Sequence, residues 1–138
     1  DGLIIPDLPF DIYVKEYKSI VDKYGLDFIL LITPETPEAR IREIDEMSSG
    51  FIYMVSSAST TGAQKSFNDE KQAYFKRIKN MRLKNPTLVG FGVSNKATYD
   101  AACTYSHGAI VGSAFIKSLQ ENATIEGAVS SLIKKIKE

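Results

Sequence analysis

Short apolar runs rich in isoleucine, valine and phenylalanine alternate along the chain with longer amphipathic stretches. This rhythm predicts βα units and a parallel sheet rather than a series of hairpins. Strands are expected at residues 3–5, 28–32, 51–55, 87–91 and 109–111. The pattern therefore indicates an α/β fold in which a helix follows each strand.

Two helices are predicted from apolar residues at helical spacing. The first is expected to present one apolar face and to end at Gly25, since glycine is common just beyond a helix C-terminus. That face consists of Tyr13, Tyr17, Ile20, Val21 and Tyr24. The last helix is expected to pack one face on the sheet, and that face consists of Ile125, Val129, Leu132, Ile133 and Ile136.

Polar residues mark the starts of the other helices. Thr36 and Pro37 are expected to serve as the N-cap and first-turn residue of the second helix. Further helices are expected over residues 68–81 and 95–105, with a short one after Gly112. Five βα units result, without a linker between them.

An open doubly wound sheet would require an opening glycine fingerprint and an acidic ribose partner, which the sequence lacks. A TIM (β/α)8 barrel fits the pattern better, but it needs eight strands and typically ~250 residues. The 138 residues are therefore expected to be the last five βα units of a single TIM-barrel domain, with about three units missing.

Composition narrows the class of partner. Seventeen basic residues balance seventeen acidic ones, which argues against nucleic acid and anionic membranes as partners. Cys103 is the only cysteine and no apolar run approaches ~18 residues, so a cytoplasmic protein without an intrachain disulfide is expected. His107 is the only histidine, which excludes a metal site built from histidines.

The strongest candidate site lies at two consecutive strand ends, Gly90-Phe91-Gly92 and Gly112-Ser113. Glycine allows the backbone to approach an anion, and a helix N-terminus favours negative charge. Barrels characteristically bind phosphate at the last two strand ends. The alternative is that these glycines only satisfy turn geometry, but their paired placement favours a phosphate site, which Gly62 is expected to close.

Several segments together resemble a known family. Residues 1–9 (DGLIIPDLP) look like its fourth barrel strand, and residues 51–56 followed by Thr61-Gly62 look like its sixth strand and the loop after it. Residues 90–94 (GFGVS) and 112–114 (GSA) match its last two strand ends. The family is the α subunit of tryptophan synthase, and the resemblance runs in order along the whole chain.

The resemblance implies a lyase subunit that cleaves indole-3-glycerol phosphate into indole and glyceraldehyde 3-phosphate. It implies a separate β subunit that receives the indole and carries pyridoxal phosphate, while the α subunit uses no cofactor. The phosphate cradle implied is Gly62, Gly92, Gly112 and Ser113, and the indole pocket implied is Ile4, Leu31, Phe91 and Ile110. Tyr53 matches a tyrosine beside the catalytic acids, and Thr61 a threonine that closes the site. Core packing is the alternative for the four apolar residues.

The family's two catalytic carboxylates, a Glu and an Asp, belong to elements upstream of Asp1, and no acid here matches either one. Asp7 matches a different family aspartate and is more typical of a turn. The chain alone is therefore expected to be inactive. Ser57 and Ser59 stand where the family often has arginine and glycine, a departure that bears on loop closure.

Two other functions are compatible with parts of the sequence. One is a non-catalytic phosphate-binding or assembly module whose exposed strand edges pair with another copy or a complementary piece. The other is a different phosphate-sugar barrel, such as an isomerase or a thiamine-phosphate enzyme. This last possibility fits Tyr53 and Thr61-Gly62 less well.

Overall fold

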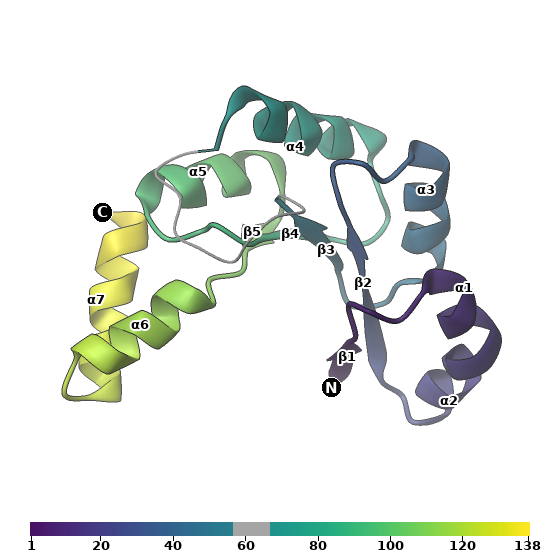
Figure 1. The fold of residues 1–138 in the computed structure, drawn as a ribbon, viewed down its shortest axis with the longest axis horizontal. Coiled ribbons are helices and arrows are strands. Elements are labelled where there is room, and N and C mark those ends of the chain that lie inside the picture. Colours follow the sequence, from purple (N-terminus) through teal and green to yellow (C-terminus); the bar gives the residue numbers. More distant parts are fainter. Residues whose placement is uncertain (57–66) are drawn as a thin grey trace.

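The computed structural model describes residues 1–56 and 67–138. Its sheet has five parallel strands in sequential order, β1-β2-β3-β4-β5, and the helices α3, α4 and α5 lie along one side of it (Figure 1). The strands are β1 (Gly2–Ile4), β2 (Asp27–Ile32), β3 (Ile52–Val55), β4 (Thr87–Gly90) and β5 (Gly108–Ala109). A doubly wound sheet reverses its strand order, whereas a barrel does not. The sequential order therefore confirms the predicted barrel architecture.

Each strand lies within two residues of its predicted position. The helices are α1 (Phe10–Ile12), a π-helix η1 (Tyr13–Tyr17), α2 (Lys18–Lys23), α3 (Glu38–Met47), α4 (Asp69–Met81), α5 (Lys96–Tyr105), α6 (Ser113–Glu121) and α7 (Ile125–Lys137). The prediction for α4 is confirmed, and Asn68 caps it by accepting a hydrogen bond from the Lys71 N–H. The predicted capping role of Thr36 is wrong. Pro37 occupies the N-cap position, and the Thr36 hydroxyl instead accepts a hydrogen bond from the Thr33 N–H.

The core lies between the sheet and the helices that cover its outer face. It contains alternate strand residues together with apolar residues of α3 and α4. They include Phe28, Leu30, Ile32, Ile52, Met54 and Val89 from the strands and Ile41, Ile44, Phe75 and Ile78 from the helices. Tyr74 fixes α4 to the end of β2, because its buried hydroxyl donates to the Ile32 carbonyl at 3.2 Å. Burial also raises the pKa of this phenol.

The first helical segment differs from its predicted face. Tyr13 and Val21 are buried, and Tyr13 stacks on Phe28 with ring centroids 3.8 Å apart. Ile20 and Tyr24 are exposed instead. The π-helix η1 is wider than an α-helix, so later positions are rotated away from the face that a 3.6-residue period predicts. The stop at Gly25 is confirmed by its left-handed φ of 62°.

The predicted packing of the last helix on the sheet is wrong. The main contacts of α7 are with α5 and α6, which Figure 1 shows beside it. Ala128 and Ile136 are buried there, whereas Ile125, Val129 and Ile133 are 72%, 40% and 46% exposed. The apolar residues of α7 do recur at helical spacing, but only part of the face that they form is buried.

The inner face of the sheet, away from the helices, carries a row of half-buried side chains. Leu31, Tyr53 and Leu88 are neighbours in register across β2, β3 and β4. In a complete barrel, such side chains fill the interior. No helix within residues 1–56 and 67–138 has the length and apolar character needed to cross a bilayer.

Candidate functional site

A cavity of about 270 Å³ lies at the carboxyl ends of β4 and β5. Six residues that the sequence singles out line it together: Tyr53, Phe91, Gly92, Ile110, Gly112 and Ser113. Tyr53 comes from within β3, and the other five follow the ends of β4 and β5, which are neighbours in the parallel sheet. Barrel enzymes build their active sites at the carboxyl ends of their strands.

The first wall of the cavity is the turn that follows β4. Phe91 and Gly92 both have left-handed backbone, with φ of 63° and 78°. Left-handed backbone is uncommon for a residue that carries a β-carbon, and it concentrates at functional sites. The buried Ser56 hydroxyl donates a hydrogen bond of 2.6 Å to the Phe91 carbonyl, and the Ser56 N–H donates to the Gly90 carbonyl at 3.2 Å.

The same turn is fixed at its far end by the start of α5. The Ser94 N–H donates to the Thr98 hydroxyl at 3.1 Å, and the Asn95 side chain accepts from the Thr98 N–H at 3.0 Å. The Thr98 hydroxyl also accepts from the Asn95 N–H at 3.2 Å, which completes a capping box. The backbone between Gly90 and Asn95 is thus anchored on both sides.

The second wall is the N-terminus of α6. The Phe115 and Ile116 N–H groups donate to the Gly112 carbonyl at 2.9 and 3.1 Å. The N–H groups of Ser113 and Ala114 belong to the first turn, where an α-helix supplies no intrahelical acceptor. The helix dipole adds a partial positive charge at this end, so the geometry suits a bound anion.

Tyr53 forms the apolar side of the cavity with Phe91, and their ring centroids lie 5.8 Å apart at 57°. Gly90 makes room for this tyrosine, because a β-carbon at Gly90 would overlap the Tyr53 hydroxyl. Burial raises the pKa of the Tyr53 phenol, which therefore stays protonated at neutral pH. Tyr53 can thus provide a flat apolar surface and a hydroxyl, but not a base.

The structure does not bring every predicted site residue to the cavity. Ile4 and Leu31 do not line the cavity. Ile4 is 46% exposed on the edge strand β1, and Leu31 lies beside Tyr53 on the inner face of the sheet. Asp7 is exposed and also lies away from it. The predicted residues Thr61 and Gly62, like Ser57 and Ser59, lie outside the described residues.

Two lysines at the cavity are absent from the sequence prediction. Lys117 reaches it from α6, where its ammonium group also lies 3.6 Å from Glu121, and Lys135 reaches it from α7. Lys117 follows Ser113 by four positions, so helical spacing could have placed it near the site. No spacing in the sequence could have placed Lys135 at the cavity, because its position depends on how α7 packs against α6.

We expect Lys135→Ala to weaken binding of inorganic phosphate by about 2- to 5-fold at low salt, since an exposed charge contributes roughly 0.5–1 kcal/mol. Added salt should reduce the difference. Isothermal titration at two ionic strengths measures both effects. Lys134→Ala is the matched control, because Lys134 precedes it on α7 but does not line the cavity. Equal losses in both variants would contradict a specific role.

His107 lies at the opposite ends of the strands, where its Nδ1 accepts a hydrogen bond of 3.1 Å from the Thr87 N–H. That contact gives the imidazole a structural role between β4 and β5. Within residues 1–56 and 67–138, histidine, cysteine and carboxylate side chains form no group of three that could hold a metal ion.

Comparison with known proteins matches this arrangement to one family. The family model described as "Tryptophan synthase alpha chain" matches residues 1–138. A tryptophan synthase alpha chain of Parabacteroides distasonis is 59% identical over 138 residues, and that of Bacteroides thetaiotaomicron is 56% identical over 137 residues. These matches cover 100% and 99% of this chain but 54% of each relative.

Solved structures agree with the sequence relatives. A D146A mutant of the tryptophan synthase alpha-subunit from Pyrococcus furiosus is 31% identical to this chain, with a TM-score of 0.77. The match covers 100% of this chain. A structure of the tryptophan synthase a2b2 complex from the same organism is 32% identical with a TM-score of 0.76. The chain spans 54% of each of these structures, about half their length. Over that length, it belongs to the tryptophan synthase alpha chain family.

Proposed function

We propose that this chain carries the phosphate-binding and indole-binding part of a tryptophan synthase α subunit. The whole enzyme would cleave indole-3-glycerol phosphate into indole and glyceraldehyde 3-phosphate. The observation that carries the proposal is the cavity at β4 and β5, which joins a helix N-terminus to an aromatic wall. A phosphate ester attached to an indole ring has both of these chemical parts.

The proposed phosphate position is between the turn after β4 and the first turn of α6. Gly92 would let the backbone approach the phosphate oxygens, while Gly112 and Ser113 would offer N–H groups from the helix start. Gly62 would complete this cradle, and Thr61 would help to close it over the substrate. Lys117 and Lys135 would add positive charge at its mouth.

The proposed indole position is against the apolar side of the same cavity. The Phe91 and Tyr53 rings and the Ile110 side chain provide that surface. Leu31 would extend it along the inner face of the sheet, and Ile4 would extend it further once the barrel is filled. Burying an aromatic ring of this kind is favourable in proportion to the apolar area removed from water.

Cleavage requires an acid to protonate the indole ring carbon and a base to accept protons from the indole nitrogen and a glycerol hydroxyl. Within the described residues, no carboxylate lines the cavity, and Tyr53 stays protonated. We therefore assign both proton transfers to a Glu and an Asp outside residues 1–138. The chain would use no cofactor, and a β subunit that carries pyridoxal phosphate would receive the indole. The a2b2 complex from Pyrococcus furiosus supports a β subunit as the partner.

A chimaera tests this proposal. The part of the Parabacteroides distasonis relative outside the matched region would be joined to this chain to complete the length of that relative. We expect the chimaera to release indole from indole-3-glycerol phosphate and the 138-residue chain alone to release none, as measured by indole absorbance or chromatography. A folded chimaera without lyase activity, or turnover by the chain alone, would contradict the proposal.

A further inference from the structure

Ser56 is the residue directly after β3, and it does not line the cavity. Its side chain is fully buried, with 0% exposure. Its hydroxyl donates to the Phe91 carbonyl at 2.6 Å, and its N–H donates to the Gly90 carbonyl at 3.2 Å. One serine therefore holds two consecutive carbonyl groups of the turn that forms the cavity wall.

This turn needs such support because of its backbone conformation. Phe91 has a φ of 63°, and left-handed backbone is unfavourable for a residue with a β-carbon. The Phe91 carbonyl belongs to the peptide group whose N–H is that of Gly92. A rotation of this peptide group would therefore reorient the Gly92 N–H.

Beyond the two bonds from Ser56, the hydrogen bonds that the described residues make to this turn from another element lie at its far end. Thr98 fixes Ser94 and Asn95 at the start of α5. Among residues 1–56 and 67–138, the Ser56 hydroxyl is the one side-chain donor found at the Phe91 carbonyl. Loss of that hydroxyl would release the left-handed peptide while the start of α5 remained fixed.

We propose that Ser56 is a positioning residue for the substrate phosphate. Its hydroxyl keeps the peptide between Phe91 and Gly92 in the orientation that presents the Gly92 N–H to a phosphate at the cavity. Ser56 does not touch the ligand itself, and its effect passes through the Phe91 carbonyl. This inference rests on the proposed function, since it assumes that the anion at this turn is a phosphate.

The test measures binding of inorganic phosphate and of indole separately, by NMR titration of the 138-residue chain. Ser56→Ala should weaken phosphate binding about 10-fold, the effect of losing one buried hydrogen bond that orients a binding group. Indole binding should change less than about 2-fold, because the ring surface of Ile110 and Tyr53 remains. Ser56→Cys, similar in size but a weaker donor, should give an intermediate loss of phosphate affinity.

Ser48→Ala is the matched control. Ser48 is also a buried serine, 6% exposed, whose hydroxyl contacts the Phe28 and Phe51 carbonyls at 3.3 and 3.2 Å. It lies near the amino ends of β2 and β3, away from the cavity. Its loss should lower the free energy of unfolding without changing the affinity for phosphate. The amide shifts of Phe91 and Gly92 should change in unliganded Ser56→Ala but not in Ser48→Ala.

The outcomes separate this inference from the proposed function. Equal phosphate affinity in the parent chain and Ser56→Ala would overturn the role of Ser56 and leave the lyase assignment standing. If Ser56→Ala does not fold, unchanged affinity in Ser56→Cys would overturn that role instead. A parent chain that binds no phosphate would overturn both proposals. An inactive chimaera whose phosphate affinity still depends on Ser56 would overturn the lyase assignment alone.

Discussion

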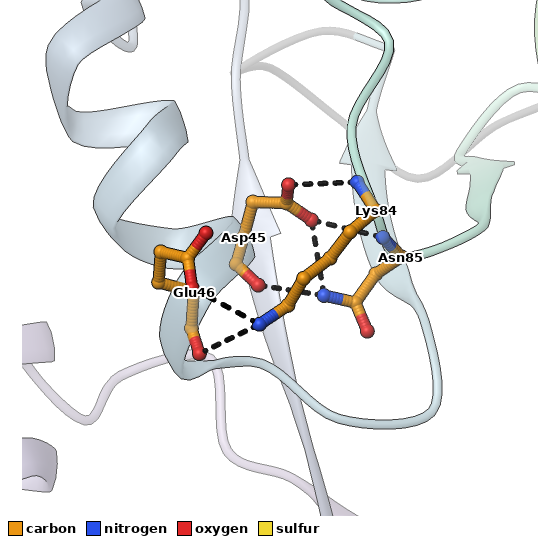
Figure 2. A network of polar contacts seen from close by, with 4 residues as sticks. All are labelled: Asp45, Glu46, Lys84 and Asn85. Carbon is orange, nitrogen blue, oxygen red and sulfur yellow. Dashed lines mark hydrogen bonds and ion pairs between the residues drawn. The ribbon is translucent and has the colours of Figure 1, made fainter.

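Replacing Asp45 by alanine is expected to lower the free energy of unfolding by about 3 kcal/mol, since it removes a buried acceptor of three hydrogen bonds. Asp45 lies on α3 and is 5% exposed. Its carboxylate accepts hydrogen bonds from the Lys84 N–H at 2.8 Å, and from the Asn85 N–H and side-chain amide at 3.0 Å each (Figure 2). Urea denaturation should show a lower midpoint with an unchanged slope.

Glu46→Ala is the matched control, because Glu46 is the next residue of the same helix. Its carboxylate pairs with the Lys84 ammonium group (Figure 2) at a distance of 3.2 Å, but both side chains are largely exposed. An exposed ion pair contributes at most about 1 kcal/mol. Equal losses in the Asp45 and Glu46 variants would show that the hydrogen bonds to the Asp45 carboxylate do not fix α3 to the segment before β4.

The contribution of Asp45 should also depend on pH. Burial alone would raise the pKa of its carboxyl, but the hydrogen bonds from Asn85 and Lys84 and the Lys84 charge outweigh it and lower the pKa below the ordinary 3.8. A carboxyl whose pKa is lower in the folded protein stabilises the fold above its unfolded pKa. That stabilisation is lost as pH falls through the lower folded value. The difference between parent and Asp45→Ala should therefore shrink below about pH 4.

The strands and the glycines that line the cavity could be predicted because their signals are local. Each strand is a short apolar run, and the glycines at Gly92 and Gly112 mark two strand ends directly in the sequence. Parallel order then places consecutive strand ends at one edge. The local pattern was therefore enough to indicate Phe91, Gly92, Gly112 and Ser113, whereas Tyr53 and Ile110 were expected from the family resemblance.

The remaining features depend on contacts between distant segments. The π turn at Tyr13–Tyr17 has no sequence period of its own, and it rotated the predicted face of the first helix. Lys135 reaches the cavity only because α7 packs on α6. The bond from Ser56 to Phe91 joins residues 35 positions apart, and nothing in the sequence marks Phe91 as left-handed. These features required the fold to be known first.

Gly90→Ala is expected to weaken indole binding by more than about 10-fold and to lower the free energy of unfolding by about 1–3 kcal/mol, as overpacking does in a filled site. Gly90 lies at the end of β4, where an added β-carbon would overlap the hydroxyl and ring of Tyr53. Because β3 and β4 are paired in register, the backbone cannot separate without losing ladder hydrogen bonds. The Tyr53 ring must therefore move toward the cavity. Indole titration and urea denaturation of the variant measure the two effects.

Gly112→Ala is the control, since a β-carbon there meets no atom within 4 Å and its φ of −96° suits any residue. Its free energy of unfolding should stay close to that of the parent chain. Truncating Tyr53 to alanine removes the group that the new methyl would strike, so the double variant with Gly90→Ala should be no less stable than Tyr53→Ala alone. If the losses in stability add instead, the strain at Gly90 does not arise from Tyr53, and the close approach of these two residues does not shape the cavity wall.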